Sequence, residues 1–117
     1  MAYLQADTKQ EQATSLYDLA NLSKMKDLAT HAPEAMNAFV AFDKAALAEG
    51  AIPRKHKELI ALGVAFTTQC PYCIELHGNK AREFGASDRE IAEAVLVAAA
   101  LRAGGAITHG THAVKGV

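Results

Sequence analysis

Residues 58–77 read ELIALGVAFTTQCPYCIELH, and this stretch predicts two consecutive helices. Leu59, Leu62 and Phe66 recur at helical spacing in its first half. Proline is favoured at the first position of a helix, where its missing N–H would have no partner. We therefore expect a new helix to begin at Pro71, which places Cys70 at its N-terminus.

The chain's two cysteines both lie in this stretch, and their spacing predicts redox chemistry. The thiolate is the nucleophilic form of cysteine, and a second thiol three residues away can capture an oxidised sulfur as a disulfide. The unpaired N–H groups and the dipole of a helix N-terminus favour an anion at Cys70. Cys73 and His77 lie one turn apart, so the imidazole can accept the thiol proton. The alternative is a pair of buried, unreactive thiols.

Prolines and glycines divide the rest of the chain into further helices. We expect helices in the segment with Leu16, Leu19, Leu22 and Met25, from Pro33 to Gly50, from Pro53 onward, from Pro71 to Gly85, and from Ser87 to Gly104–Gly105. Ser87 followed by Glu90 predicts a capping box. The fifth helix is almost continuously apolar, so we expect its burial in the core or between subunits. The prediction is a compact all-α bundle of five to six helices that forms oligomers.

Composition excludes several classes of protein. The chain has 117 residues, half of them hydrophobic, without a linker or repeat, which predicts a single domain over residues 1–117. Its net charge is −1 with both signs interspersed, so no basic stripe for nucleic acid is present. The N-terminus lacks a signal-peptide pattern, and the apolar run from Ala92 to Leu101 is interrupted by Glu93 and too short for a bilayer. We expect a cytoplasmic protein without a membrane partner.

The spacing of Glu58, Cys70, Cys73 and His77 resembles the active-site signature of the alkylhydroperoxidase D-like proteins, within the carboxymuconolactone decarboxylase superfamily. The likeness extends over about residues 33–112, including the FGASDREI turn and the alanine-rich helix that ends in Gly-Gly. It implies that Cys73 is the peroxidatic thiol and that Cys70 resolves the sulfenic acid to a disulfide. It further implies that His77 is the base for Cys73 and that Glu58 orients His77.

The resemblance also implies partners: a hydroperoxide substrate, a disulfide reductant such as a lipoyl-bearing adapter or a thioredoxin-like protein, and further copies in a trimer or hexamer. No cofactor and no resident metal are expected. One departure concerns Tyr72, which stands where the best characterised branch has a relay histidine. Because tyrosine titrates near about pH 10, it is a poor proton shuttle at neutrality, and we interpret it as a wall of the substrate pocket. His109 is a second candidate for the pocket.

Other interpretations of the same residues remain open. Cys70, Cys73, His109 and His112 supply the four donors of a tetrahedral zinc site, although their separation exceeds that of a zinc finger. Glu58 has a structural alternative in a surface pair with Arg54 or Lys55. A thiol-disulfide reductase or a redox sensor would use the same cysteines. A carboxymuconolactone decarboxylase-like lyase would need neither.

Overall fold

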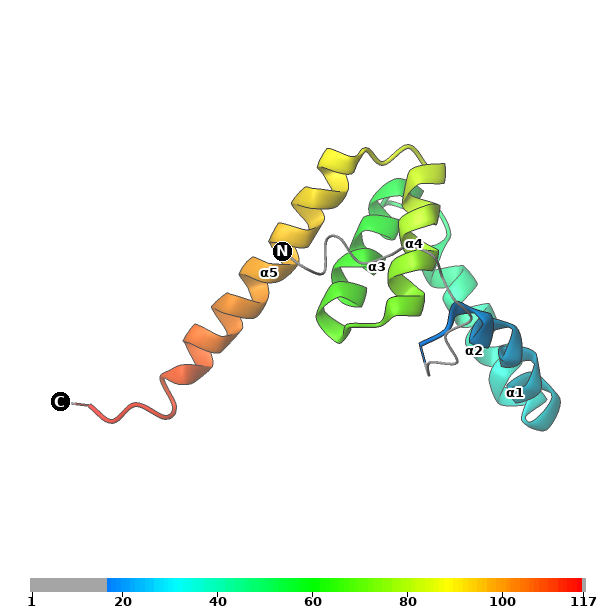
Figure 1. Cartoon of the computed structure of the whole chain (residues 1–117), viewed down its shortest axis with the longest axis horizontal. Helices are drawn as coiled ribbons and strands as arrows, with labels where there is room; N and C mark the ends of the chain where they lie inside the picture. Colours follow the sequence, from blue (N-terminus) through cyan, green and yellow to red (C-terminus); the bar gives the residue numbers. More distant parts are fainter. Residues whose placement is uncertain (1–16, 117) are drawn as a thin grey trace.

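A computed structural model describes residues 17–116 of the chain. A short 3-10 helix, η2 (Leu19–Lys24), leads into α1 (Met25–His31), and four longer helices follow: α2 (Pro33–Leu47), α3 (Arg54–Thr68), α4 (Pro71–Glu83) and α5 (Asp88–Gly110). The described residues contain no strand. The predicted all-α fold is therefore confirmed (Figure 1).

The predicted starts of three helices are confirmed. Pro33 and Pro71 occupy first-turn positions of α2 and α4. At the start of α5, the Ser87 hydroxyl accepts from the Glu90 N–H at 3.1 Å, and the Glu90 carboxylate accepts from the Ser87 N–H at 3.0 Å. This reciprocal pair satisfies two N–H groups that the helix leaves without internal partners.

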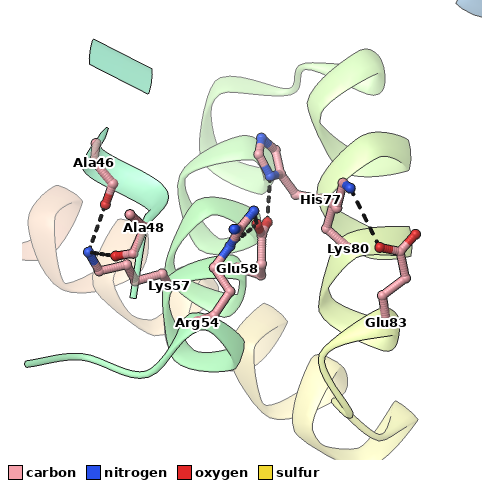
Figure 2. Close-up of polar contacts among 8 residues, drawn as sticks. All are labelled: Ala46, Ala48, Arg54, Lys57, Glu58, His77, Lys80 and Glu83. Carbon is pink, nitrogen blue, oxygen red and sulfur yellow. Dashed lines mark hydrogen bonds and ion pairs between the residues drawn. The ribbon is translucent and has the colours of Figure 1, made fainter. Parts of the chain in front are cut away.

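The first two helical segments differ from the prediction. Leu16 lies outside the described residues, and the segment after it forms η2 before α1, with Asp18 capping η2. The second helix ends at Leu47 rather than at Gly50. There, Lys57 of α3 donates hydrogen bonds to the Ala46 and Ala48 carbonyls, which are C-terminal groups without helical partners (Figure 2).

The prediction that Gly104–Gly105 bend or end the fifth helix is wrong, because α5 continues to Gly110. Glycine weakens a helix by about 1 kcal/mol relative to alanine but does not forbid it. Helix-favouring alanines on both sides, Ala103 and Ala106, compensate for it. The result is an uninterrupted helix of 23 residues.

The core lies where α3 packs against α4 and α5. Its buried members are Leu62, Ala65, Ala81 and Ala86. Of the two places predicted for the fifth helix, burial in the protomer's core is wrong, because α5 contains no buried residue in the protomer; burial between subunits stays a prediction. Figure 1 shows α5 extending to one side of the α3–α4 pair and α1–α2 to the other. The Cα radius of gyration is 18.1 Å, whereas a compact domain of this length has a radius of about 13 Å.

By length and composition alone, α5 is long and apolar enough to cross a membrane. An 18-residue window in it has a mean hydropathy of 1.6, and 6% of that window is buried in the protomer. The apolar run from Ala92 to Leu101 was predicted to be too short for a bilayer, but the helix that contains it is longer, from Asp88 to Gly110. One such helix among the described residues is weak evidence for a membrane protein.

Candidate redox site

The two cysteines lie together at the turn between α3 and α4. Gln69 adopts a left-handed conformation, with φ 56° and ψ 45°, and this reverses the chain so that α4 packs back along α3. Cys70 is the N-cap of α4, as the sequence predicts, and Cys73 lies in the first turn. Both thiols are free, and their sulfurs are 2.6 Å apart. The pair is therefore positioned to close a disulfide with little movement.

Hydrogen bonds from Cys73 stabilise a negative charge on Cys70. The Cys73 thiol lies 2.6 Å from Cys70 Sγ, where it stabilises the Cys70 thiolate, and the Cys73 backbone N–H donates to the same sulfur at 3.3 Å. These two contacts, in that order, hold the pKa of Cys70 below its ordinary value. This agrees with the anion that the helix N-terminus was expected to favour at this position.

Cys73 is the thiol that keeps its proton in the resting pair. Burial raises the pKa of Cys73 to about 11, aided by its hydrogen bond to Cys70, the charge on Cys70 and the carboxylate of Asp43. The pair therefore loses its first proton from Cys70, below the ordinary thiol pKa, and its second from Cys73. The thiol with the lower pKa is Cys70, although the family resemblance implies attack by Cys73.

Glu58 is completely buried and connects α3 to α4 (Figure 2). Its Oε2 lies 2.6 Å from His77 Nδ1, and its Oε1 accepts from Arg54 Nε at 3.0 Å and Nη2 at 2.8 Å. The pair with Arg54 that the alternative named is therefore present, but it is not a surface pair, because the Glu58 carboxylate is fully buried and Arg54 is only partly exposed. Lys55 pairs with Glu90 instead, at 2.9 Å. A buried carboxylate needs such partners to remain ionised.

The Glu58 contact fixes the orientation of the His77 ring. If Nδ1 donates its proton to the carboxylate, Nε2 is left as an acceptor. In Figure 2 this second nitrogen points away from Glu58, Lys80 and Glu83, toward the N-terminal end of α4. No hydrogen bond joins His77 to either sulfur in the described part of the chain. The structure thus brings Glu58 and His77 together on the helices that carry the thiols.

Arg54 is a member of this site that the sequence analysis treated only as a partner in a surface pair. Its guanidinium lies over the Phe84 ring, 4.7 Å from the centroid, while its N–H groups bind Glu58. Stacking on one face and bidentate donation along one edge are characteristic uses of arginine. The i to i+4 spacing of Arg54 and Glu58 was the sequence signal for this pair, but spacing does not show whether a pair is buried.

Tyr72 is contacted by the segment that precedes α1. Its hydroxyl accepts from Asn21 Nδ2 at 3.2 Å, and its ring centroid lies 6.4 Å from that of Tyr17. A hollow of about 430 Å³ lies beside Tyr17, and Tyr17, Phe66, Gln69, Pro71 and Ile74 line it, whereas Tyr72, the predicted wall residue, is not among them. Tyr17 and Phe66 are thus wall residues that the sequence analysis missed.

His109 lies apart from the thiols in the protomer. It is exposed near the C-terminal end of α5, where its Nδ1 lies 2.9 Å from the Gly105 carbonyl and its ring 5.8 Å from that of His112. Figure 1 shows this end of α5 well away from the α3–α4 turn. Within residues 17–116, no three His, Cys, Asp or Glu side chains form a group suited to a metal ion. The protomer therefore does not assemble the four-residue zinc alternative.

Comparisons with known proteins agree with this fold. The family model of the carboxymuconolactone decarboxylase family matches residues 33–116. An uncharacterized protein from the cox locus of Paracoccus denitrificans is 47% identical over 78 residues, which cover 67% of this chain and 70% of that protein. An uncharacterized protein of Cupriavidus necator is 35% identical over 65 residues, covering 56% of this chain and 58% of its own length.

Two solved structures share the fold. A carboxymuconolactone decarboxylase family protein from Legionella pneumophila superposes with a TM-score of 0.67 at 29% identity, over 73% of this chain and 76% of that chain. A protein from Methanobacterium thermoautotrophicum superposes with a TM-score of 0.70 at 31% identity, over 75% of this chain and 99% of that chain. The chain belongs to the carboxymuconolactone decarboxylase family, which confirms the superfamily that its sequence resembles.

Proposed function

We propose that this chain is a thiol peroxidase that reduces hydroperoxides through Cys70 and Cys73. The observation that carries the proposal is the contact between two free sulfurs, 2.6 Å apart, at the start of the helix whose next turn bears His77. Glu58 holds that histidine from the neighbouring helix at 2.6 Å. A nucleophile, a resolving thiol and an oriented acid-base group are thus available together.

In the proposed reaction, the two sulfurs exchange the proton they share, so that Cys73 carries the charge. The Cys73 thiolate attacks the terminal peroxide oxygen and breaks the O–O bond, forming a sulfenic acid and releasing an alkoxide. A proton from solvent converts the alkoxide to an alcohol; His77 passes it on through Nε2, and the Glu58 carboxylate holds the ring and balances its charge during the transfer. Cys70 then attacks the Cys73 sulfur, water leaves, and the disulfide forms. A disulfide reductant returns both thiols.

The test counts free thiols after one equivalent of tert-butyl hydroperoxide between pH 5 and 9. We expect wild type to lose two thiols rapidly. Cys70→Ser should lose one and accumulate on Cys73 a sulfenic acid that dimedone traps, whereas Cys73→Ser should react slowly. Reaction of both thiols no faster than free cysteine, with an apparent pKa near about 8.5, would refute the peroxidase proposal. A decarboxylase-like lyase activity would survive loss of both thiols.

A second candidate, thiol-disulfide reductase, is favoured by the lowered pKa of Cys70. In that reaction the Cys70 thiolate attacks a substrate disulfide, one substrate thiolate leaves, and Cys73 then attacks Cys70 and releases the second. The pKa of Cys70 is already lowered by the Cys73 donors, so no proton exchange is needed first. Trapping of a mixed disulfide on Cys70 in Cys73→Ser, together with slow peroxide reaction in wild type, would support this function over the peroxidase.

A further inference from the structure

Two neighbouring hollows lie beside the C-terminal end of α3, close to the turn that carries Cys70. The hollow beside Tyr17 is flanked by Gln69 and Pro71, the two residues on either side of Cys70 in the sequence. A second hollow, of about 310 Å³, lies between α3 and α5. The two hollows share Phe66 and Gln69 in their walls, so they adjoin each other, and together they form a depression whose Tyr17 end is lined by the two sequence neighbours of Cys70.

Arg102 of α5 gives this depression its charge. The other lining side chains are apolar or neutral, and Arg102 is the one charged group among the described residues that line it. Arg102 is exposed and forms no ion pair within the part of the chain that the structure describes. A guanidinium presents a planar array of N–H donors that matches a carboxylate. The depression therefore combines an apolar floor with one anion-binding group.

We propose that this depression binds an organic hydroperoxide with an apolar body and a carboxylate. The carboxylate pairs with Arg102, the body lies against Phe66 and Ile74, and the peroxide group reaches the thiols. This inference rests on the proposed peroxidase and names its substrate class. The redox balance is unchanged: two thiols and the hydroperoxide give the disulfide, the hydroxy acid and water.

Charge complementarity favours a carboxylate ligand over an apolar protein surface as the occupant of this depression. An apolar helix from a second copy would leave Arg102 without a counter-ion while removing it from water, which costs free energy. A carboxylate ligand supplies the counter-ion and still covers the apolar walls. Hydrogen peroxide would use neither feature, so the depression discriminates among peroxides.

The test compares the 13-hydroperoxide of linoleic acid with its methyl ester, which differs in the charge and one methyl group. We expect wild type to prefer the acid in kcat/KM by about tenfold at low salt, and this preference should weaken as ionic strength rises. Arg102→Gln should bring the ratio close to one. Arg89→Gln is the matched control, because Arg89 is an exposed arginine of the same helix outside the depression, next to Glu93.

Binding of the reduced product, 13-hydroxylinoleic acid, and its methyl ester to oxidised protein gives a readout that does not need turnover. Tighter binding of the acid that is lost in Arg102→Gln supports the site even if neither hydroperoxide is reduced, in which case the proposed function alone fails. If wild type reduces both hydroperoxides and the ratio of kcat/KM for the acid to that for the ester is near one, the proposed site is wrong. A changed molar mass of Arg102→Gln in light scattering also overturns it, because the groove would then be a subunit contact.

Discussion

At the scale of single residues, Glu58 is the side chain on which the site depends most. Its carboxylate is fully buried. One oxygen accepts hydrogen bonds from Arg54 on the same helix, α3, and the other contacts His77 on α4. Replacement by glutamine keeps the shape but removes the charge that both partners require. We expect Glu58→Gln to lower the free energy of unfolding by about 2 kcal/mol and to slow thiol oxidation by peroxide.

Urea denaturation measures the first effect and thiol counting the second. Glu83→Gln is the control, because Glu83 is exposed and its pair with Lys80 is long, at 3.5 Å. A surface pair of this kind contributes less than about 1 kcal/mol. Equal stability losses in the two variants would contradict the structural importance assigned to Glu58.

The residue-scale features that follow from spacing could be predicted from the sequence. Glu58 and His77 lie on consecutive helices, and Pro71 fixes Cys70 at a helix start, so their proximity and the lowered pKa of Cys70 follow from local rules. The high pKa of Cys73 could not be predicted, because it depends first on burial by neighbouring elements. The inward position of Arg54 depends on Phe84, thirty positions away in the sequence, and no periodicity reports that contact.

At the scale of elements, two glycines illustrate what local sequence does and does not decide. Gly105 continues a helix, whereas Gly85 ends the turn after α4 with φ +90°. An added Cβ at either position meets nothing within 4 Å, so the backbone conformation alone decides the effect of alanine. The stop predicted at Gly104–Gly105 failed because a glycine pair permits both outcomes, and the flanking alanines favour the helix.

We expect Gly105→Ala to raise the free energy of unfolding by about 0.5 to 1 kcal/mol, because alanine restricts the unfolded chain and fits a helix. Gly85→Ala should lower it by about 1 kcal/mol or more, because L-residues are strained at positive φ. Thermal unfolding of the two variants beside wild type gives both signs in one experiment. Destabilisation by Gly105→Ala would mean that α5 is bent or closely packed at that position.

At the scale of the whole molecule, α5 presents more apolar surface than the protomer can cover. Residues that face α3 line the depression, but Leu96 and Ile107 point elsewhere and are 67% and 74% exposed. Leu96, Ala100, Ala103 and Ile107 recur at intervals of three and four, so they share a second apolar face of the helix. Contiguous apolar surface of this kind marks an interaction site. We propose that further copies of the chain cover it.

This proposal predicts that light scattering gives three or six times the 12.4 kDa protomer mass, as the trimer or hexamer implied by the resemblance requires. Leu96→Glu should shift the mass toward the protomer, because a carboxylate buried without a partner at a subunit contact costs several kcal/mol. Glu93→Gln, on the same helix and already exposed beside Arg89, should leave the assembly intact. A monomeric wild type, or one that is recovered only with detergent or lipid vesicles, would contradict the proposal, since α5 would then be free or covered by a membrane.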